Sequence, residues 1–415
     1  MDSSPWRLTL LVSDGRHSCS RSSVSDHNLS AGLQHLQRSL TPPPPATSQP
    51  VWIRLDALPP DQRTEFADDL QQAMHNELLV PMGIQRQPIT WARPASGSLH
   101  LWVDLSRPPR QPASPLLEMR ERALGWLLRH LEHRVQEPPP NTVDALAALL
   151  LLSGTSDRPD LELSRFRLTR ALQLQGPTAE PVPSSVLTQA LKLAVLTNQL
   201  NDPHTLPPDL EATCRALQEH LLAQFAVMSL SPAVRPAVLF SLAVAHRRGL
   251  TNTNWQDPLA QLIVRLQDRP GGANWERTWC LLTLVVLAET GAPLPLELQE
   301  HLVEPGDLQA LAALPTAAMI HSAVSALRVV LMLRLADLLR LPLRDENVRD
   351  YSKAAERVLL GLQCNPMQAI EARDPQQVLG AFGGDLTGPA PLRRQLTPLL
   401  VLHQSLLMER SHALD

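Results

Sequence analysis

Residues 256–291 read QDPLAQLIVRLQDRPGGANWERTWCLLTLVVLAETG, and this stretch decides the fold. Its first part, which ends at Leu266-Gln267, has the apolar spacing of an amphipathic helix. The pair Gly271-Gly272 can adopt the positive φ of a tight turn. Thr278–Ala288 follows and is apolar on every face, which is typical of a helix that is covered on both sides. The stretch therefore predicts an outer helix, a glycine turn and a buried inner helix.

The same order returns in residues 352–407. A helix ends at Leu362-Gln363, an insertion follows, and Gly383-Gly384 precedes a second apolar helix. In both copies a Gln lies near the end of the outer helix, where its amide can pair backbone groups that the helix leaves free. The two copies together predict a repeated pair of helices, one outer and one inner.

Helical spacing continues through most of the chain after Leu116, and loops with Pro, Gly and Asn separate the segments. Ala145–Leu152 is apolar all round and is expected in an inner layer, whereas Asn347–Gln363 is amphipathic and is expected at a surface. The alternation favours a double layer of helices. We predict helices near 116–135, 142–153, 162–174, 184–199, 207–229, 233–248, 256–267, 275–290, 316–340, 347–363 and 391–410.

At the Leu-Gln and Gly-Gly positions the sequence resembles the α/α-toroid superfamily, which includes squalene and terpene cyclases and the β-subunits of protein prenyltransferases. The resemblance is clear in the two segments quoted above, and over the remainder of 142–415 it rests on the rhythm of the helices. It implies a double-layered α/α toroid. An irregular α-solenoid remains the alternative fold.

The N-terminal part differs, because short β-type segments occur there. We predict strands at Trp6–Val12, Val51–Leu55 and Leu99–Leu105, with helices at Asn28–Leu40 and Asp61–Leu79 between them. The predicted organisation is a small α/β domain of order β-α-β-α-β at 1–110, a linker and connecting helix at 111–140, and an α/α helical domain at 141–415.

The first strand and the residues after it also resemble the core of the AMMECR1-like domain. The resemblance rests on Asp14-Gly15-Arg16 and Cys19. The family has Arg-Gly-Cys-Ile-Gly at this place, and His17–Arg21 departs from that pattern. We draw no functional residue from it.

Composition restricts the class of protein. The 415 residues carry 37 Lys plus Arg and 41 Asp plus Glu, a net charge of −4, so no basic excess suggests a nucleic-acid partner. Charged residues are 19% and hydrophobic residues 44%, which argues against a disordered chain. Lys192 and Lys353 are the only lysines, a skew that we attribute to genomic base composition.

The chain has no CxxC pair, no signal-peptide pattern at Met1–Val12 and no apolar run near the roughly 18 residues of a membrane span, so a cytoplasmic protein is expected.

The catalytic residues that the resemblance would imply are missing. Cyclases of this superfamily carry an Asp-x-Asp-Asp motif, and the acid nearest to that pattern is Asp385 in a Gly-Gly-Asp-Leu turn. Five Phe and one Tyr are too few to line a cavity that stabilises carbocations. If the chain is an enzyme, the candidate acids or bases are Asp385, Glu276 and His403.

A zinc site of the prenyltransferase kind is likewise incomplete. The resemblance implies an Asp-x-Cys pair and a distant His, but Thr278 stands where the pair would have its Asp before Cys280. The tightest metal-like group is His130, Glu132 and His133. Its two histidines are three residues apart on a helix face that is usually solvated, and no third ligand lies nearby in the sequence. We therefore expect no metal site, and no cofactor.

One segment has the character of a contact site. Asn274, Trp275, Arg277 and Trp279 lie at the start of the most buried predicted helix, and Trp and Arg are the residue types that anchor interfaces. These observations favour a non-catalytic binding or scaffolding protein that recognises a protein partner. The alternatives are an enzyme that acts on an isoprenoid or glycan-like substrate in the toroid cavity, and an open solenoid that holds a peptide on a concave face.

Overall fold

The computed structural model describes only part of the chain, and every structural statement below concerns that part. The described residues are 6–13, 19–26, 31, 32, 34, 35, 38, 51–56, 90–92, 98–104, 114–132, 142–153, 159–174, 184–198, 209–226, 234–250, 256–268, 274–290, 302, 304–314, 316–383 and 390–412. The chain divides into two compact units. Unit 1 comprises Met1–Val135 and Gln363–Pro391, and unit 2 comprises Gln136–Leu362 and Leu392–Asp415.

This division differs from the predicted organisation at two places. The helix predicted as a connector and the insertion between the two halves of the second repeat both group with the N-terminal strands. No local sequence pattern links the two segments, so this grouping was not predicted. The physical reason for it is that side chains of the connecting helix donate to backbone carbonyls of the insertion, as described below for Arg129.

Unit 1 contains a five-stranded sheet of order β2-β1-β5-β3-β4. β1 pairs with β2 antiparallel and with β5 parallel, and β3 pairs with β5 antiparallel and with β4 parallel. Strands were predicted at the places of β1, β3 and β5, while β2 and β4 were missed. Of the predicted helices, Asp61–Leu79 lies outside the described residues, and the described part of Asn28–Leu40 is helical. The strands are β1 Trp6–Ser13, β2 Cys19–Asp26, β3 Val51–Asp56, β4 Thr90–Ala92 and β5 Ser98–Asp104.

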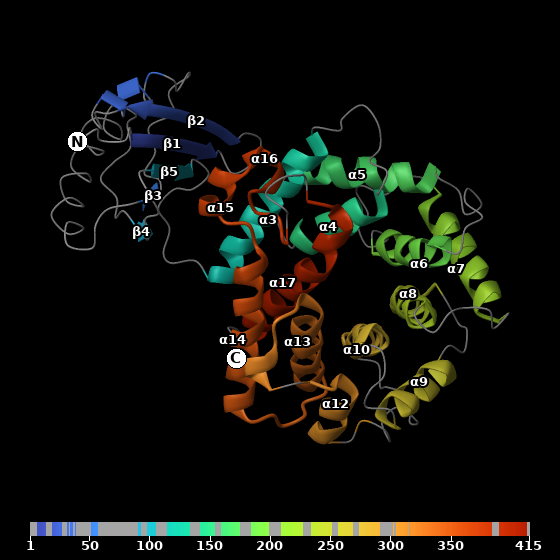
Figure 1. Cartoon of the computed structure of the whole chain (residues 1–415). Coiled ribbons are helices and arrows are strands. Elements are labelled where there is room, and N and C mark those ends of the chain that lie inside the picture. The colour runs from blue at the N-terminus through green and yellow to red at the C-terminus, as the bar shows by residue number, and fades with distance from the viewer. Residues whose placement is uncertain are drawn as a thin grey trace. The chain divides into compact units, whose positions relative to one another are not determined.

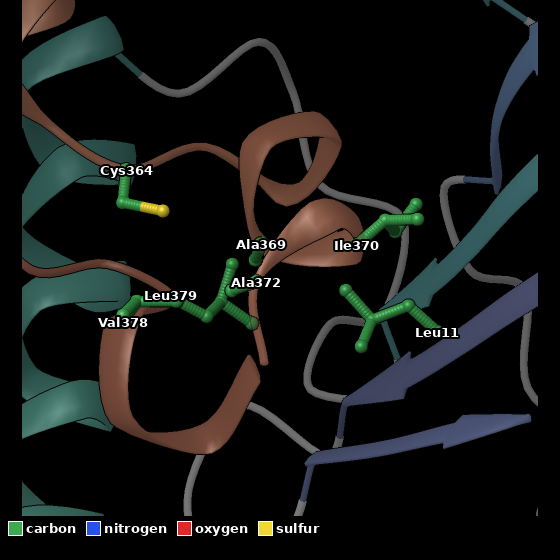
Figure 2. Packing of buried hydrophobic residues seen from close by; sticks show 7 residues of the cluster. All are labelled: Leu11, Cys364, Ala369, Ile370, Ala372, Val378 and Leu379. Atoms are coloured by element: carbon green, nitrogen blue, oxygen red, sulfur yellow. The ribbon is translucent and has the colours of Figure 1, made fainter. Parts of the chain in front are cut away.

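The core of unit 1 joins β1 to the segment that follows Gln363. Leu11 of β1 is fully buried and faces Ile370, and the cluster continues through Ala369 and Leu379 (Figure 2). Arg21 of β2 donates to the carbonyls of Ile370 at 3.1 Å and Ala372 at 2.6 Å. Apolar burial and these hydrogen bonds place the segment against the sheet. Its helices are α15 Pro366–Glu371 and α16 Pro375–Val378, and the preceding helix of the unit is α3 Pro115–Glu132.

Side chains of α3 and of Gln363 fix the rest of this segment. Gln363 Nε2 donates to the carbonyls of Met119 at 2.8 Å and Gly380 at 3.3 Å, so it pairs backbone groups of α3 and of the segment after it, not those of the outer helix that it follows. Arg129 is 2% exposed and donates to the carbonyl of Leu379 at 2.8 Å. Trp126 Nε1 donates to the carbonyl of Gln377 at 2.9 Å. These bonds pair carbonyls that the short helix α16 leaves free.

Unit 2 is helical, which confirms the mainly helical character predicted for the C-terminal part of the chain. Helices α12, α15 and α16 were missed. The helix predicted at 316–340 begins later, because Ser322 caps it by accepting from the Ser325 backbone N–H at 3.2 Å. The helices of unit 2 are α4 Thr142–Ser153, α5 Pro159–Leu174, α6 Ser184–Thr197, α7 Leu210–Ala226, α8 Arg235–Arg247, α9 Gln256–Asp268, α10 Asn274–Ala288, α12 Pro305–Ala312, α13 Ala323–Leu338, α14 Asp345–Leu362 and α17 Leu392–His412.

The helices of unit 2 differ in how they are covered. Each of α4, α6, α8, α10, α13 and α17 packs against two others of this set, and we call these six the inner helices. Figure 1 shows α5, α7, α9, α12 and α14 on their outside. The burial of α14 fits its amphipathic pattern, since Ala355, Val358 and Leu359 are buried while Arg349 and Lys353 are exposed. No helix among the described residues is both long enough and apolar enough to cross a membrane.

Gly380 provides a test of how unit 1 is built. Its φ is +87°, and a Cβ at this position would overlap the backbone carbonyl of Arg122 on α3. We expect Gly380→Ala to lower the free energy of unfolding by about 2 kcal/mol or more, because the left-handed backbone and the overlap both oppose a side chain. Urea denaturation of the full chain, followed by circular dichroism, measures this.

The matched control is Gly361→Ala. Gly361 lies in α14, and a Cβ there would meet nothing within 4 Å. Because Ala favours a helix over Gly, we expect unchanged or slightly higher stability, by up to about 1 kcal/mol. Equal losses in both variants would contradict the packing of residue 380 against α3.

Candidate functional site

The two tryptophans of the predicted contact segment lie in different surroundings. Trp275, in the first turn of α10, is 44% exposed. Trp279, one turn later, is half-buried, and its ring lies 5.3 Å from the ring of Phe240 on α8. Asn274 begins α10. Trp275 is therefore the aromatic side chain of this segment that solvent reaches most freely.

Arg277, unlike Trp275, is enclosed by the protein and pairs backbone carbonyls. It is fully buried, and its guanidinium donates to the carbonyls of Leu266 at 2.7 Å, Ala310 at 3.1 Å and Leu311 at 2.7 Å. Leu266 lies in the last turn of α9, and the other two carbonyls end α12. Carbonyls at a helix C-terminus have no partner in their own helix. Arg277 thus joins the ends of two outer helices to the inner helix α10.

Arg328 of α13 extends this arrangement. It is 5% exposed and donates to the carbonyl of Ala312 at 2.9 Å, at the same end of α12. Burial lowers the pKa of Arg328, and repulsion by the Arg277 guanidinium lowers it further. The carbonyl dipoles of α12 supply the negative potential that lets two guanidinium groups share this region.

The candidate acids and bases are separated. Glu276 is 8% exposed and pairs with Arg265 of α9, with 2.9 Å between Oε1 and Nη2. His403 lies on α17, and its Nδ1 is 3.1 Å from the carbonyl of Leu151 in the last turn of α4. Asp385 lies outside the described residues. No hydrogen bond or ion pair in the described part of the chain joins Glu276 to His403.

The candidate metal ligands are also dispersed. Burial raises the pKa of the Cys280 thiol to about 12, so the protonated form, which does not ligate zinc, is favoured. Thr278 is fully buried, and His130 stacks on Trp126 with 5.3 Å between ring centroids. His133 lies outside the described residues. Within the described ranges, no group of three or more His, Cys, Asp or Glu side chains is arranged to hold a metal ion.

A polar network that the sequence analysis missed lies at the ends of the inner helices. Arg247, the last residue of α8, donates to Glu289 Oε2 at 2.9 Å and to Asn198 Oδ1 at 2.9 Å. Arg334 of α13 lies 3.5 Å from Glu289 Oε1. The members are between 42 and 136 residues apart along the chain and share no motif. The one signal in the sequence is that polar or charged residues end several apolar helices.

Replacement of Arg277 should test its structural role. We expect Arg277→Met to lower the free energy of unfolding by about 2–4 kcal/mol, because three buried carbonyls lose their donors. Urea denaturation of the full chain measures the change. The control is Arg215→Met on α7, since Arg215 is 54% exposed and pairs with an exposed Glu211. An exposed ion pair contributes about 0–1 kcal/mol, so losses of similar size in the two variants would contradict the role of Arg277.

His403 should make stability depend on pH. Burial lowers the pKa of His403, and Arg334 and Arg410 lower it further, against the hydrogen bond to Leu151. The unfolded chain therefore binds more protons than the folded chain near and below pH 6.5, so acidification from pH 7.5 to 5.5 destabilises the fold. We expect the melting temperature of His403→Gln to fall less over this range than that of the unmodified chain.

The same substitution at His220, on the outer helix α7, controls for the loss of a histidine as such. Differential scanning fluorimetry at constant ionic strength measures all three proteins. A pH dependence of His403→Gln as steep as that of the unmodified chain would contradict a buried, neutral imidazole at this position.

Comparison with known proteins leaves the family open. No family model matches the chain, and neither the curated proteins nor the solved structures include a significant match. The function must therefore be argued from the arrangement of the described residues.

Proposed function

We propose that the chain is a non-catalytic binding or scaffolding protein whose helical unit is a closed, double-layered α/α toroid. The order of contacts among the inner helices supports a closed ring. α4 packs on α6, α6 on α8, α8 on α10, α10 on α13, α13 on α17, and α17 again on α4. In an open solenoid each repeat contacts only its neighbours in sequence, which would keep α4 apart from α17.

Fully buried leucines on every inner helix support a binding role over catalysis in a central cavity. Each inner helix carries at least one leucine that is at most 1% exposed, as expected where Leu side chains pack between the helices. The set includes Leu146, Leu193, Leu242, Leu284, Leu331 and Leu402.

The separation of the candidate acids and bases is the observation on which the proposal depends most. General acid and base catalysis needs two groups within reach of one substrate. Glu276 is paired with Arg265 on an outer helix, and His403 faces a backbone carbonyl of α4. The two residues lie on α10 and α17, and each of these helices packs on α13. This arrangement uses both side chains to hold helices together.

Trp275 is the residue that we expect to contact a partner. It combines a large apolar ring with an exposed fraction of 44%, and aromatic side chains of this kind contribute strongly to protein interfaces. Arg277 and Trp279 then act behind it, because the first pairs buried carbonyls and the second packs on Phe240. The contact surface would include the start of α10.

Identification of the partner and reconstitution of the complex test the proposal. The full chain is purified from its native cells by affinity, the co-purified protein is identified, and its Kd for the purified chain is measured by calorimetry. We expect Trp275→Ala to raise the Kd at least about tenfold, since truncation of a central aromatic contact costs more than about 1 kcal/mol. Leu163→Ala on α5, where Leu163 is 50% exposed, is the control and should leave the Kd unchanged.

The enzyme alternative makes the opposite prediction. It requires a co-purified isoprenoid or glycan that the chain converts, with the conversion lost in Glu276→Gln or His403→Gln. That outcome, without a specific protein partner, would overturn the binding proposal.

A further inference from the structure

Basic side chains of three inner helices gather in unit 2. Arg247 and Arg248 end α8, and Arg334 lies near the end of α13. His403 and Arg410 lie on α17, close enough to Arg334 for its charge to act on the imidazole. We call these five residues the basic cluster. Its contacts reach Asn198 after α6, Glu289 after α10 and the Leu151 carbonyl of α4, so all six inner helices contribute.

Two guanidinium groups of the cluster share one carboxylate in the described part of the chain. Glu289 Oε2 pairs with Arg247 and Glu289 Oε1 with Arg334, so both of its oxygens face guanidinium groups. Asp337 and Glu409, acids on α13 and α17, are exposed, and so is Arg410 of the cluster. Burial lowers the pKa of Arg248, and repulsion by Arg247 lowers it further. The cations therefore repel one another in a partly desolvated region.

Several donors of the cluster also lack acceptors. The Nε atoms of Arg247, Arg248 and Arg334 are buried and have no hydrogen-bond partner among the described residues. A buried donor without an acceptor destabilises the fold, and more so when it is charged. The helix C-termini supply part of the missing negative potential, which lets the cluster form without a ligand. They do not pair these N–H groups.

The cluster differs from Arg277 and Arg328 in exposure and not in having unpaired donors, because the Nε of Arg328 is likewise buried without a hydrogen-bond partner among the described residues. Those two guanidinium groups bind carbonyls at helix ends through their Nη atoms and lie deep in the unit, with exposed fractions of 0% and 5%. In the cluster the side chains of Arg247 and Arg334 are 24% and 11% exposed, so solvent and solutes reach them. Partial exposure with unpaired donors is the condition under which an incoming anion gains most.

We infer that the basic cluster is a binding site for an oxyanion, a phosphate or carboxylate group of a ligand. The planar guanidinium fork matches both groups, because each offers two oxygens at a spacing that two N–H donors can reach. Arg248 and Arg334 supply the charge, and Glu289 holds Arg247 and Arg334 at a fixed separation. The inference deepens the proposed function, on which it rests for the idea that the oxyanion belongs to a binding partner.

Titration of the full chain with small oxyanions tests the site without the partner. Inorganic phosphate, pyrophosphate and citrate are added at constant ionic strength set with NaCl, and the melting temperature and the heat of binding are measured. We expect a saturable rise in melting temperature, since a ligand that binds the folded state stabilises it by mass action. A stronger response to phosphate or pyrophosphate assigns a phosphate group, and a stronger response to citrate assigns a carboxylate.

The variants Arg334→Gln and Arg248→Gln should each weaken binding at least tenfold. Arg215→Gln removes one positive charge from the exposed surface of α7 and should leave binding unchanged. Arg248→Gln leaves both ion pairs of Glu289 in place. If Arg334→Gln does not fold, the oxyanion affinity of Arg248→Gln therefore tests the site. The inference is overturned if no oxyanion gives a saturable response, or if Arg215→Gln weakens binding as much as the cluster variants.

The two proposals fail in different ways. Loss of the oxyanion response with retained, Trp275-dependent partner binding would remove the site and keep the proposed function. An oxyanion response without any protein partner would keep the site and overturn the binding role that we assign to the chain.

Discussion

Carbonyl groups at the ends of buried helices are the constraint on which this structure depends. An α-helix leaves its last four carbonyls unpaired, and a double layer of helices brings many such ends out of water. Side chains therefore have to supply the donors. Arg277 and Arg328 do so at the ends of α9 and α12, and Trp126 and Arg129 do so around α16.

Arginine suits this task better than lysine. One guanidinium carries five N–H donors in a rigid plane, so Arg277 pairs three carbonyls from two helices at once. An ammonium group on a flexible stem would hold the same helices less specifically. The near absence of lysine from the sequence, which by itself indicates only a base-composition bias, thus coincides with a structural use of arginine at buried helix ends.

Apolar periodicity predicted the helices because it reports directly on burial. Most helices of unit 2 were placed within a few residues, and α4 and α10, apolar all round in sequence, lie in the inner set. The short helices α12, α15 and α16 were missed because Pro and capping residues define them more than periodicity does. Asn365 and Asp374, for instance, cap α15 and α16 by accepting from backbone N–H groups at 3.0 Å.

The candidate site was harder to predict because tertiary contacts decide what a polar residue does. Arg277 and Trp275 are two positions apart in the sequence, yet one is fully buried and the other is 44% exposed. The basic cluster draws its residues from segments far apart in the chain, and no local pattern links them.

The two groups of arginines show why position along a helix matters more than residue type. Arg277 and Arg328 meet carbonyls of neighbouring helix ends, which are neutral dipoles with fixed geometry, so Nη donors of both residues are used within the fold. Arg247 and Arg334 meet one shared carboxylate, so a charge remains and the side chains stay partly accessible. Helix ends that face their neighbours are closed by such arginines, whereas ends that face solvent retain charge. In the proposed ring, the inner helices would bring this uncompensated charge together, and a partner with acidic groups would recognise it by charge.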